Sequence, residues 1–471
     1  MDVERTDVMR LLRFLLLCAF TASARAEELP APESARFLIE TITVEAPGKN
    51  AAVIIESETL LKEGGTYTED DLRRSVARIH RLPFVLDTTF SLRKGSERGA
   101  YELVIQANTA RWFFFDSTVH FFEFDEPYTL GELSGDTSPW SHSGLIGGRV
   151  FTGKSGVLYG SFGFQRELGE DSDGVRVGYT HYNLFGRGIA VDLSYAGHCC
   201  ATEVLPFGID PKLTTWDWVD DQQASLKLSI PLAPHRSIQL GWTERSGQAQ
   251  GLQEVLEPVW EKPFFDVVLD GDQDTRHLEA RWVQDTSDDP ILPSRGTILS
   301  AGVEYDSYQA VNLRAERLVI DPDGVFIPGR EIELPDFDGE QIIAMASAAR
   351  IWSVTPRQSV SAGGLISAGR SQLSGLVIDD RVLPKTDLDV YGLAARARHL
   401  LRIWALREPG ILGDVYLDTN LTYSIERTTP DLGLEANPLE RLDLTTAIVY
   451  RCQWGRVRLA FTYLNLGRVL R

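Results

Sequence analysis

The feature that most constrains the fold of this 471-residue chain is an alternation of apolar and polar side chains that recurs after Asn108. Successive side chains of a β-strand point to opposite faces, so the alternation predicts strands with one apolar and one polar face. The clearest alternating segments span residues 175–180, 189–195, 226–230, 238–243, 278–283, 299–305, 417–425 and 456–463. Their repetition predicts a mostly β domain over residues 112–471.

Two details of these segments favour strands that cross a membrane. Many end in an aromatic residue, as expected for a girdle at the lipid interface: Tyr179, Tyr195, Trp242, Trp282, Tyr305 and Tyr463. The second face carries charges, as the wall of a polar lumen does: Arg176, Asp192, Lys227, Glu279, Arg281 and Asp418. Because backbone groups in lipid must all be paired, such a sheet has to close on itself. We therefore predict a transmembrane antiparallel β-barrel of about 14–16 strands.

A soluble all-β protein with one buried face is the alternative, because it would show the same alternation. The start of the chain favours the barrel. It has a basic region, a short apolar region and an A-x-A cleavage site, at Arg5 to Arg13, Phe14 to Ala22 and Ala24 to Ala26. We expect residues 1–26 to be a signal peptide, with Met9 as an alternative start. No apolar run after the first thirty residues reaches the ~20 residues of a membrane helix.

The charge balance excludes one class of partner. The chain carries 47 Lys and Arg against 67 Asp and Glu, a formal net charge of -20. Such a surface repels phosphates, so we expect no nucleic acid partner. Three acidic stretches rich in turn residues, 201–221, 247–274 and 318–340, are predicted to be extracellular loops, and the short turn at 231–235 a periplasmic one.

Cysteine and histidine positions give little sign of chemistry. The mature chain keeps Cys199, Cys200 and Cys452, which do not make a disulfide framework. His198-Cys199-Cys200 has no spaced second ligand pair, so we favour a loop or strand end over a metal site. No nucleophile elbow, phosphate loop or zinc-type histidine pair is present in the sequence. We therefore expect no enzyme, cofactor or metal.

Residues 36–108 have a different pattern and predict a small α+β domain. A strand over 37–46 is followed by a helix over 53–62 that stops at Gly64-Gly65. Thr68-Glu69-Asp70-Asp71 is a capping box that opens a second helix, which Pro83 ends. Strands over 84–92 and 100–106 complete the order strand, helix, helix, strand, strand, with a turn at 94–96.

This small domain resembles a polypeptide-transport-associated (POTRA) domain in its element order and in the segments 64–72 and 82–85. Two barrel segments are similar to turns of the BamA/TamA and two-partner-secretion superfamily of outer-membrane transporters, also called bacterial surface antigens. The first is Asn183, Leu184, Phe185, Gly186, Arg187 and Gly188, and the second runs from Asp285 to Gly296 and includes Pro293 and Arg295. As chemistry, both are hairpin turns in which glycine tolerates positive φ. The resemblance covers residues 36 to 465.

The resemblance implies a function and partners. The family inserts or translocates proteins at the bacterial outer membrane, so it implies a periplasmic domain that captures unfolded client polypeptide, a barrel in contact with outer-membrane lipid, and accessory assembly proteins.

In the family, a loop places an Arg-Gly pair in the lumen against acids of the wall. The matching segment here is 369–376, in which Ser374 precedes Gly375 and Arg370 lies close by, with Asp418, Glu279 and Arg281 as wall candidates. Ser374 in the arginine position and the chain end beyond Tyr463 leave a passive outer-membrane pore as the alternative function.

Overall fold

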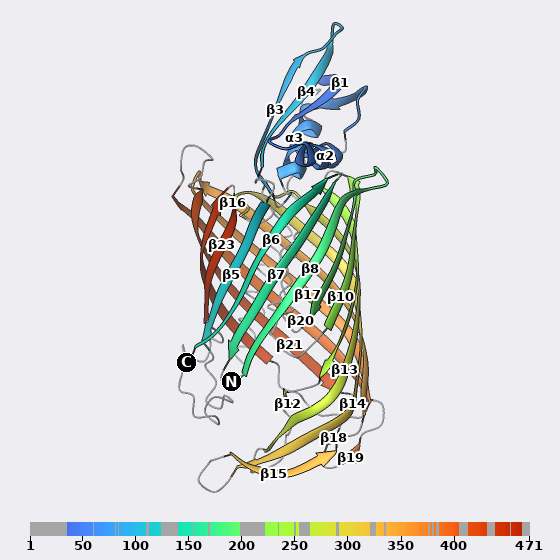
Figure 1. The fold of residues 1–471 in the computed structure, drawn as a ribbon, viewed down its shortest axis with the longest axis vertical. Coiled ribbons are helices and arrows are strands. Elements are labelled where there is room, and N and C mark those ends of the chain that lie inside the picture. Colours follow the sequence, from blue (N-terminus) through green and yellow to red (C-terminus); the bar gives the residue numbers. More distant parts are fainter. Residues whose placement is uncertain are drawn as a thin grey trace, which may run out of the picture.

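The computed structural model places a small domain at one end of a β-barrel (Figure 1). It describes residues 35–463 except 60, 81, 83, 110–112, 124–139, 154, 168–169, 198–221, 234, 249–250, 254–263, 289–291, 321–325, 334–335, 375–376, 379–380, 383–385, 405–412, 431–438 and 453. The predicted signal peptide and Cys199-Cys200 therefore lie outside the described residues. Among the described residues, no helix has the length and apolar character needed to cross a bilayer.

The small domain is a four-stranded sheet with two helices. Its elements in chain order are β1 (Arg36–Glu45), α2 (Lys49–Glu58), β2 (Gly65–Thr68), α3 (Glu69–His80), β3 (Val85–Lys94) and β4 (Ala100–Thr109). The sheet order is β2-β1-β4-β3, in which β1 and β4 are parallel and the other pairs antiparallel. One apolar cluster joins helices and sheet: Ile39, Ile54, Ile55, Leu72, Ile79, Leu103 and Ile105.

The sequence predicts most of these elements but misses two details. Helix α2 begins and ends four residues before the predicted range of 53–62, and the short strand β2 was not expected. Residues 65–68 form a strand because they pair with the start of β1. This long-range pairing cannot be recognised in the local sequence pattern of residues 65–68. The capping box is confirmed: Thr68 Oγ1 accepts from the Asp71 N–H over 3.2 Å, and Asp71 Oδ2 accepts from the Thr68 N–H over 3.0 Å.

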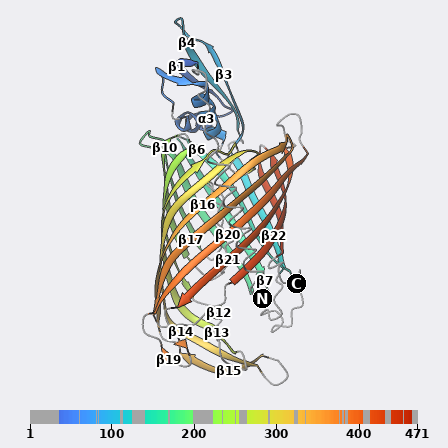
Figure 2. The ribbon, with the colours of Figure 1, turned by 180° about the vertical axis from the view of Figure 1, so that it is seen from behind.

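The barrel is a closed ring of 15 strands. They are β5 (Phe113–Glu123), β6 (Trp140–Gly153), β7 (Gly156–Glu167), β8 (Glu170–Leu184), β9 (Ile189–Gly197), β10 (Gln222–Ala233), β11 (Arg236–Gln248), β13 (Phe264–Asp285), β14 (Gly296–Ile320), β16 (Phe337–Thr355), β17 (Gln358–Ser374), β20 (Thr386–Trp404), β21 (Asp414–Pro430), β22 (Leu439–Cys452) and β23 (Gly455–Tyr463). Short strands β12 (Gly251–Gln253), β15 (Phe326–Glu333), β18 (Val377–Ile378) and β19 (Arg381–Val382) lie outside the ring, at the end away from the small domain (Figures 1 and 2).

Closure of the ring departs from the antiparallel prediction at one place. Every other neighbouring pair of ring strands is antiparallel, but β23 and β5 are parallel, from Gly455 opposite Phe115 to Tyr463 opposite Glu123. An odd number of strands in an up-and-down ring makes the first and last strands run in the same direction. Strand count can be approximated from the alternation, but its parity cannot, and parity decides how the ring closes.

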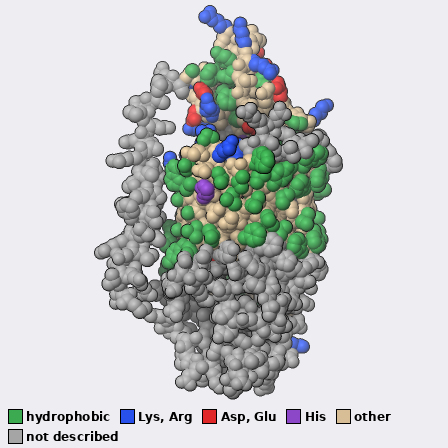
Figure 3. Space-filling model, turned by 90° about the vertical axis from the view of Figure 1, so that its left-hand side faces the viewer, with side chains coloured by type: hydrophobic (Ala, Val, Ile, Leu, Met, Phe, Trp, Pro, Cys, Tyr) green, Lys and Arg blue, Asp and Glu red, His purple; other side chains and the backbone are tan. Residues whose placement is uncertain are grey.

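The two faces of the barrel strands differ as the alternation predicts. Val303 is 49% exposed whereas Glu304 beside it is 2% exposed, and Ile448 is 48% exposed between the buried Ala447 and Val449. Figure 3 shows hydrophobic side chains over the described surface of the barrel below the small domain. The apolar side chains therefore face outwards and the polar ones face the lumen.

Two of the three predicted extracellular loops are wrong over much of their length. In 247–274 the structure has the end of β11, all of β12 and half of β13, and in 318–340 it has the end of β14, all of β15 and the start of β16. These segments are paired strands at the end of the barrel away from the small domain. The third stretch, 201–221, lies outside the described residues. Residues 231–233 end β10 and Arg236 begins β11, so these strands are joined at the small-domain end, and the periplasmic location of their connection stays a prediction.

Candidate functional site

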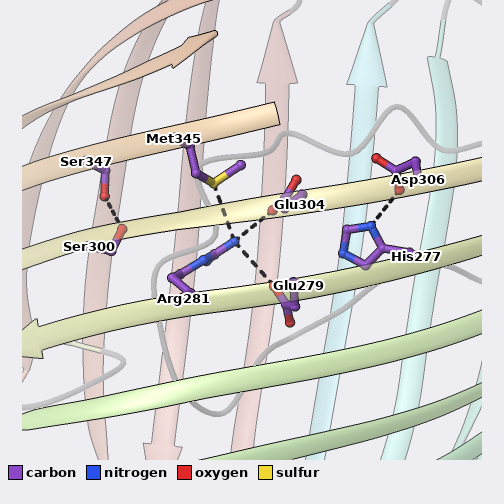
Figure 4. A network of polar contacts seen from close by, with 8 residues as sticks. All are labelled: His277, Glu279, Arg281, Ser300, Glu304, Asp306, Met345 and Ser347. Atoms are coloured by element: carbon purple, nitrogen blue, oxygen red, sulfur yellow. Dashed lines mark hydrogen bonds and ion pairs between the residues drawn. The ribbon is translucent and has the colours of Figure 1, made fainter. Parts of the chain in front are cut away.

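A polar network on the inner face of β13, β14 and β16 contains two of the predicted wall residues, Glu279 and Arg281 (Figure 4). Arg281 Nη2 donates to Glu304 Oε1 over 3.0 Å and lies 3.5 Å from Glu279 Oε2. The same guanidinium is 3.8 Å from the sulfur of Met345. One arginine from β13 thus joins carboxylates from two strands.

His277 extends this network towards the far end of the barrel. Its Nδ1 is 2.6 Å from Asp306 Oδ1, and this pair lies one inward position along β13 and β14 from the pair of Glu279 and Glu304. Ligand atoms of His277, Glu279 and Glu304 lie within 4.8 Å of one another, a donor set that suits a divalent transition metal. Because Arg281 already contacts both carboxylates, a metal would have to displace a cation that the fold supplies. The geometry favours an ion-pair network.

A second lumen cluster centres on Asp418, the third predicted wall residue. Arg398 Nε and Nη2 donate to the two carboxylate oxygens of Asp418 over 2.7 and 3.1 Å, a bidentate pair between β20 and β21. Asn420 Nδ2 also donates to Asp418, over 3.1 Å. Asn420 Oδ1 accepts from Arg396 Nη2 over 2.8 Å. Arg396 and Arg398 are two residues apart on β20, and Asp418 and Asn420 are two residues apart on β21. All four side chains therefore face inwards.

The turn between β13 and β14 reaches across to this cluster's wall. Asp288 Oδ1 accepts from the N–H groups of Ser294 and Arg295 over 2.8 and 3.1 Å. Gly296 has φ +128, and a Cβ there would lie 2.5 Å from the Ser287 backbone, so the turn requires glycine. The Pro293 carbonyl accepts from Ser359 Oγ of β17 over 3.0 Å. Leu292 packs on inner-face residues of β20, β22 and β23: Leu400, Ala447, Val449 and Ala460. The turn therefore lies across part of the barrel mouth.

The small domain is docked on the same rim. The Phe84 ring lies edge-on to Phe151 of β6 and Tyr182 of β8, with centroids 4.7 and 6.1 Å away. Val85 O accepts from Arg451 Nη2 of β22 over 2.7 Å. His80 Nδ1 lies 2.8 Å from Asp288 O in the β13–β14 turn. Three separate parts of the rim thus hold the domain.

The motif at 183–188 is the turn between β8 and β9, as predicted. Phe185, Gly186 and Gly188 have φ of 56, 67 and 66. Asn183 Oδ1 accepts from the Gly188 N–H over 2.8 Å and closes the turn. Leu184 ends β8 and Arg187 is an exposed turn residue. This segment shapes a hairpin at the small-domain end.

The expected lumen loop at 369–376 is wrong where the structure describes it. Residues 369–374 are the end of β17, paired with β16 and β20. Arg370 is exposed and shares its side of the strand with Ile366, which is 52% exposed on the outer face. Ser374 is the last residue of β17, and Gly375 lies outside the described residues. Gly369 and Ser371, which suggested a loop, are small inward positions of this strand.

Three residues of these networks were not predicted from the sequence. Arg398 pairs with Asp418, Glu304 pairs with Arg281, and Arg396 donates to Asn420. A signal was present, because Arg396 and Arg398 are spaced by two within a strand, as are Arg456 and Arg458. The wall acids that the resemblance would pair with a loop arginine are paired with arginines of the wall itself, Glu279 with Arg281 of the same strand and Asp418 with Arg398 of the neighbouring strand. Because these acids already have arginine partners, the absence of an arginine at position 374 does not leave them without a counter-ion.

Comparisons with known proteins give structural likenesses only. No family model and no curated protein sequence matches the chain. The structure is similar to BamA from Haemophilus ducreyi lacking POTRA domains 1–3, with a TM-score of 0.36 and 10% identity, covering 91% of this chain and 81% of that one. It is also similar to the siderophore receptor PiuA from Acinetobacter baumannii, with a TM-score of 0.33 and 10% identity, covering 92% and 73%.

A third structure, the ferric citrate transporter FecA in the unliganded form, has a TM-score of 0.32 and 11% identity, covering 80% of this chain and 60% of that one. The three differ in their named functions, and their TM-scores are similarly low. They do not distinguish one function from another. The architecture of this chain is established by its own strand pairing, a closed barrel with an apolar outer face and a polar lumen.

Proposed function

We propose that this protein is a bacterial outer-membrane barrel whose small domain, in the periplasm, captures unfolded polypeptide for insertion or export by the barrel. The observation that carries the proposal is the sheet edge β3. In the sheet order β2-β1-β4-β3 this strand pairs with β4 on one side and, among the described residues, with no strand on the other. An edge strand offers backbone N–H and C=O groups to an extended chain.

The position of β3 supports a route to the barrel. Val85, its first residue, is fully buried at the rim, and its carbonyl accepts from Arg451 of the barrel wall. The strand then runs away from the rim for 10 residues to Lys94. A polypeptide paired along this edge would be led to the barrel mouth, where the β13–β14 turn lies.

A photo-crosslinking amino acid in the full-length protein in cells tests capture. At Thr89 or Ser91 of β3 it should form adducts with other polypeptides, whereas at Gln106 of β4, which is exposed but paired with strands on both sides, it should form few. Depletion of the protein should also lower the amounts of outer-membrane or secreted clients. Equal adduct yields at all three positions, together with normal client levels, would reject the proposal.

A passive pore is the second candidate, and one observation favours it. The wall acids Glu279, Glu304 and Asp418 are paired with wall arginines, so no loop arginine is needed to neutralise them. Steady conductance of the full-length protein in a planar bilayer, with unchanged client levels after depletion, would support the pore. Recovery of the mature protein in a detergent-free soluble fraction would contradict both candidates, because each requires a barrel in lipid.

A further inference from the structure

Four arginines gather on the inner wall of β20 and β23, and no step of the proposed function uses them. The arginine cluster consists of Arg396, Arg398, Arg456 and Arg458. Each is two residues from its neighbour on the same strand, so each pair shares the inward face. Arg456 is 7% exposed, and Arg398 has an 11% exposed side chain.

The described hydrogen bonds from the cluster reach one carboxylate, that of Asp418. Arg398 forms both of its hydrogen bonds described above with Asp418. Arg396 instead donates from Nε and Nη2 to Asn420 Oδ1, over 3.2 and 2.8 Å. That oxygen belongs to a neutral amide. The fork of Arg396 is therefore positioned by a group that does not cancel its charge.

The electrostatic neighbours of the cluster are mostly like charges. Arg396 lies within range of Arg398 and Arg458 as well as Asp418. Arg458 lies within range of Arg398 and Arg456 as well as Asp418. The same inner wall also carries Asp443 of β22, which is 4% exposed, and Asp414 of β21, which pairs with Arg402. Cations held together away from bulk water raise the free energy of the folded state unless an anion joins them.

The wall beneath the cluster is apolar and made of small residues. Ala447 and Ala460 are fully buried, and they lie with Val449 and Leu400 under Leu292 of the β13–β14 turn. Leu400 and Ala460 share the inward faces of β20 and β23 with the arginines, so these strands carry apolar and cationic positions side by side. An apolar floor also weakens screening by water, so the field of the arginines is stronger there than at an exposed surface.

The network on β13 and β14 has the opposite balance. There Arg281 contacts the carboxylates of Glu279 and Glu304, and Asp306 pairs with His277. The inward residues of β16 between the two walls are uncharged at Ile343, Met345 and Ser347. Carboxylates outnumber arginines in the network of β13 and β14, and arginines outnumber carboxylates in the cluster of β20 and β23, so an anion is favoured at the cluster.

We propose that the arginine cluster binds a small soluble oxyanion in the lumen, with the Arg396 and Arg458 guanidiniums as the main ligands. Planar guanidinium forks match the oxygens of phosphate and carboxylate groups. The bound anion would offset the excess positive charge on this wall. The inference goes beyond the proposed function, since it holds whether the barrel handles polypeptide or conducts ions.

Thermal unfolding of the full-length protein refolded in detergent tests the site, with inorganic phosphate as the probe. A ligand that binds only the folded state raises the unfolding temperature in a saturable way. At constant ionic strength, replacement of chloride by phosphate should raise the temperature at which the folded band disappears on a gel by roughly 2–4 °C. The double variant Arg396→Gln/Arg458→Gln should lose this rise.

Two further variants complete the experiment. Arg370→Gln removes an arginine from the outer face and should keep the full rise. Arg396→Lys keeps the charge without the fork and should keep part of it. If the double variant does not refold, Arg396→Gln takes its place and should reduce the rise by more than half. No saturable rise with phosphate, or an equal rise in the arginine variants, would overturn the proposal.

Discussion

Asp418 shows how one residue holds an arginine-rich wall together. Its side chain is 7% exposed, and it accepts hydrogen bonds from Arg398 and Asn420. A buried pair adds little net stability over an apolar replacement, but loss of one partner leaves the other charge without its counter-ion. Asp418 therefore matters more for the charge it compensates than for the bond it makes.

The first prediction follows from this asymmetry. Asp418→Asn should lower the free energy of unfolding by about 3–5 kcal/mol, because Arg398 keeps its charge in a place that water reaches poorly. Addition of Arg398→Gln in the same chain should recover part of the loss, with a coupling of about 0.5–3 kcal/mol. Urea titration followed by the shift of the folded band on a gel measures both values.

Arg370→Gln is the matched control for that series. It removes an arginine from an exposed outer position, so we expect a change within about 0.5 kcal/mol. Strictly additive losses in the Asp418 and Arg398 double variant would contradict the coupling.

Among the elements, helix α3 has an N-terminus that its local sequence specifies. Hydrogen bonds from the Thr68 hydroxyl and then from its backbone N–H lower the pKa of Asp71 below its ordinary value. A lowered pKa in the folded state means that the ionised carboxylate favours folding. The contribution is complete above the ordinary aspartate pKa of about 3.9 and is lost as the pH falls through the lowered value.

The second prediction tests this cap. Thr68→Ala should weaken the amide-exchange protection of α3 by about 1 kcal/mol in the full-length protein near neutral pH, and should reduce its loss of protection in acid. Thr66→Ala, in the same strand, is the control and should leave α3 unchanged. Equal protection in both variants would show that the hydroxyl does not cap the helix.

Docking of the small domain gives a third prediction. Phe84→Ala removes the ring that packs on Phe151 and Tyr182, so the domain should become mobile relative to the barrel. Spin labels at Ser96, in the turn between β3 and β4, and at Ser353, near the rim on β16, should then show a broader distance distribution. Phe37→Ala removes an equivalent ring that packs on Tyr101 within the domain, and it should keep the narrow distribution.

Elements differ in how much of them the sequence reveals. Period-two alternation placed Glu279, Arg281 and Asp418 on the inner wall, and capping chemistry placed the start of α3. The partners of these residues depend on which strands are neighbours and in what register, and no single segment encodes that. The segment at 369–374 was misread because glycine and serine suit a loop as well as an inward strand position beside a close neighbour.

The seam between β23 and β5 is a property of the whole molecule and carries the fourth prediction. In the parallel register Val457 lies opposite Ser117. In a background with serine at the native cysteine positions, Ser117→Cys/Val457→Cys should therefore cross-link on mild oxidation and keep the barrel band folded at higher temperature. The shifted pair Ser117→Cys/Tyr463→Cys should not. The reverse outcome would contradict the parallel register.

Direction along that seam has a geometric consequence. Because β23 and β5 run in the same direction, one additional strand inserted between them could run antiparallel to both. The resulting ring would have an even number of strands, and every neighbouring pair would be antiparallel. Insertion of a two-stranded hairpin would instead leave one parallel pair in the ring. The odd number of strands therefore means that one added strand, and not two, would make the pairing of the ring antiparallel throughout.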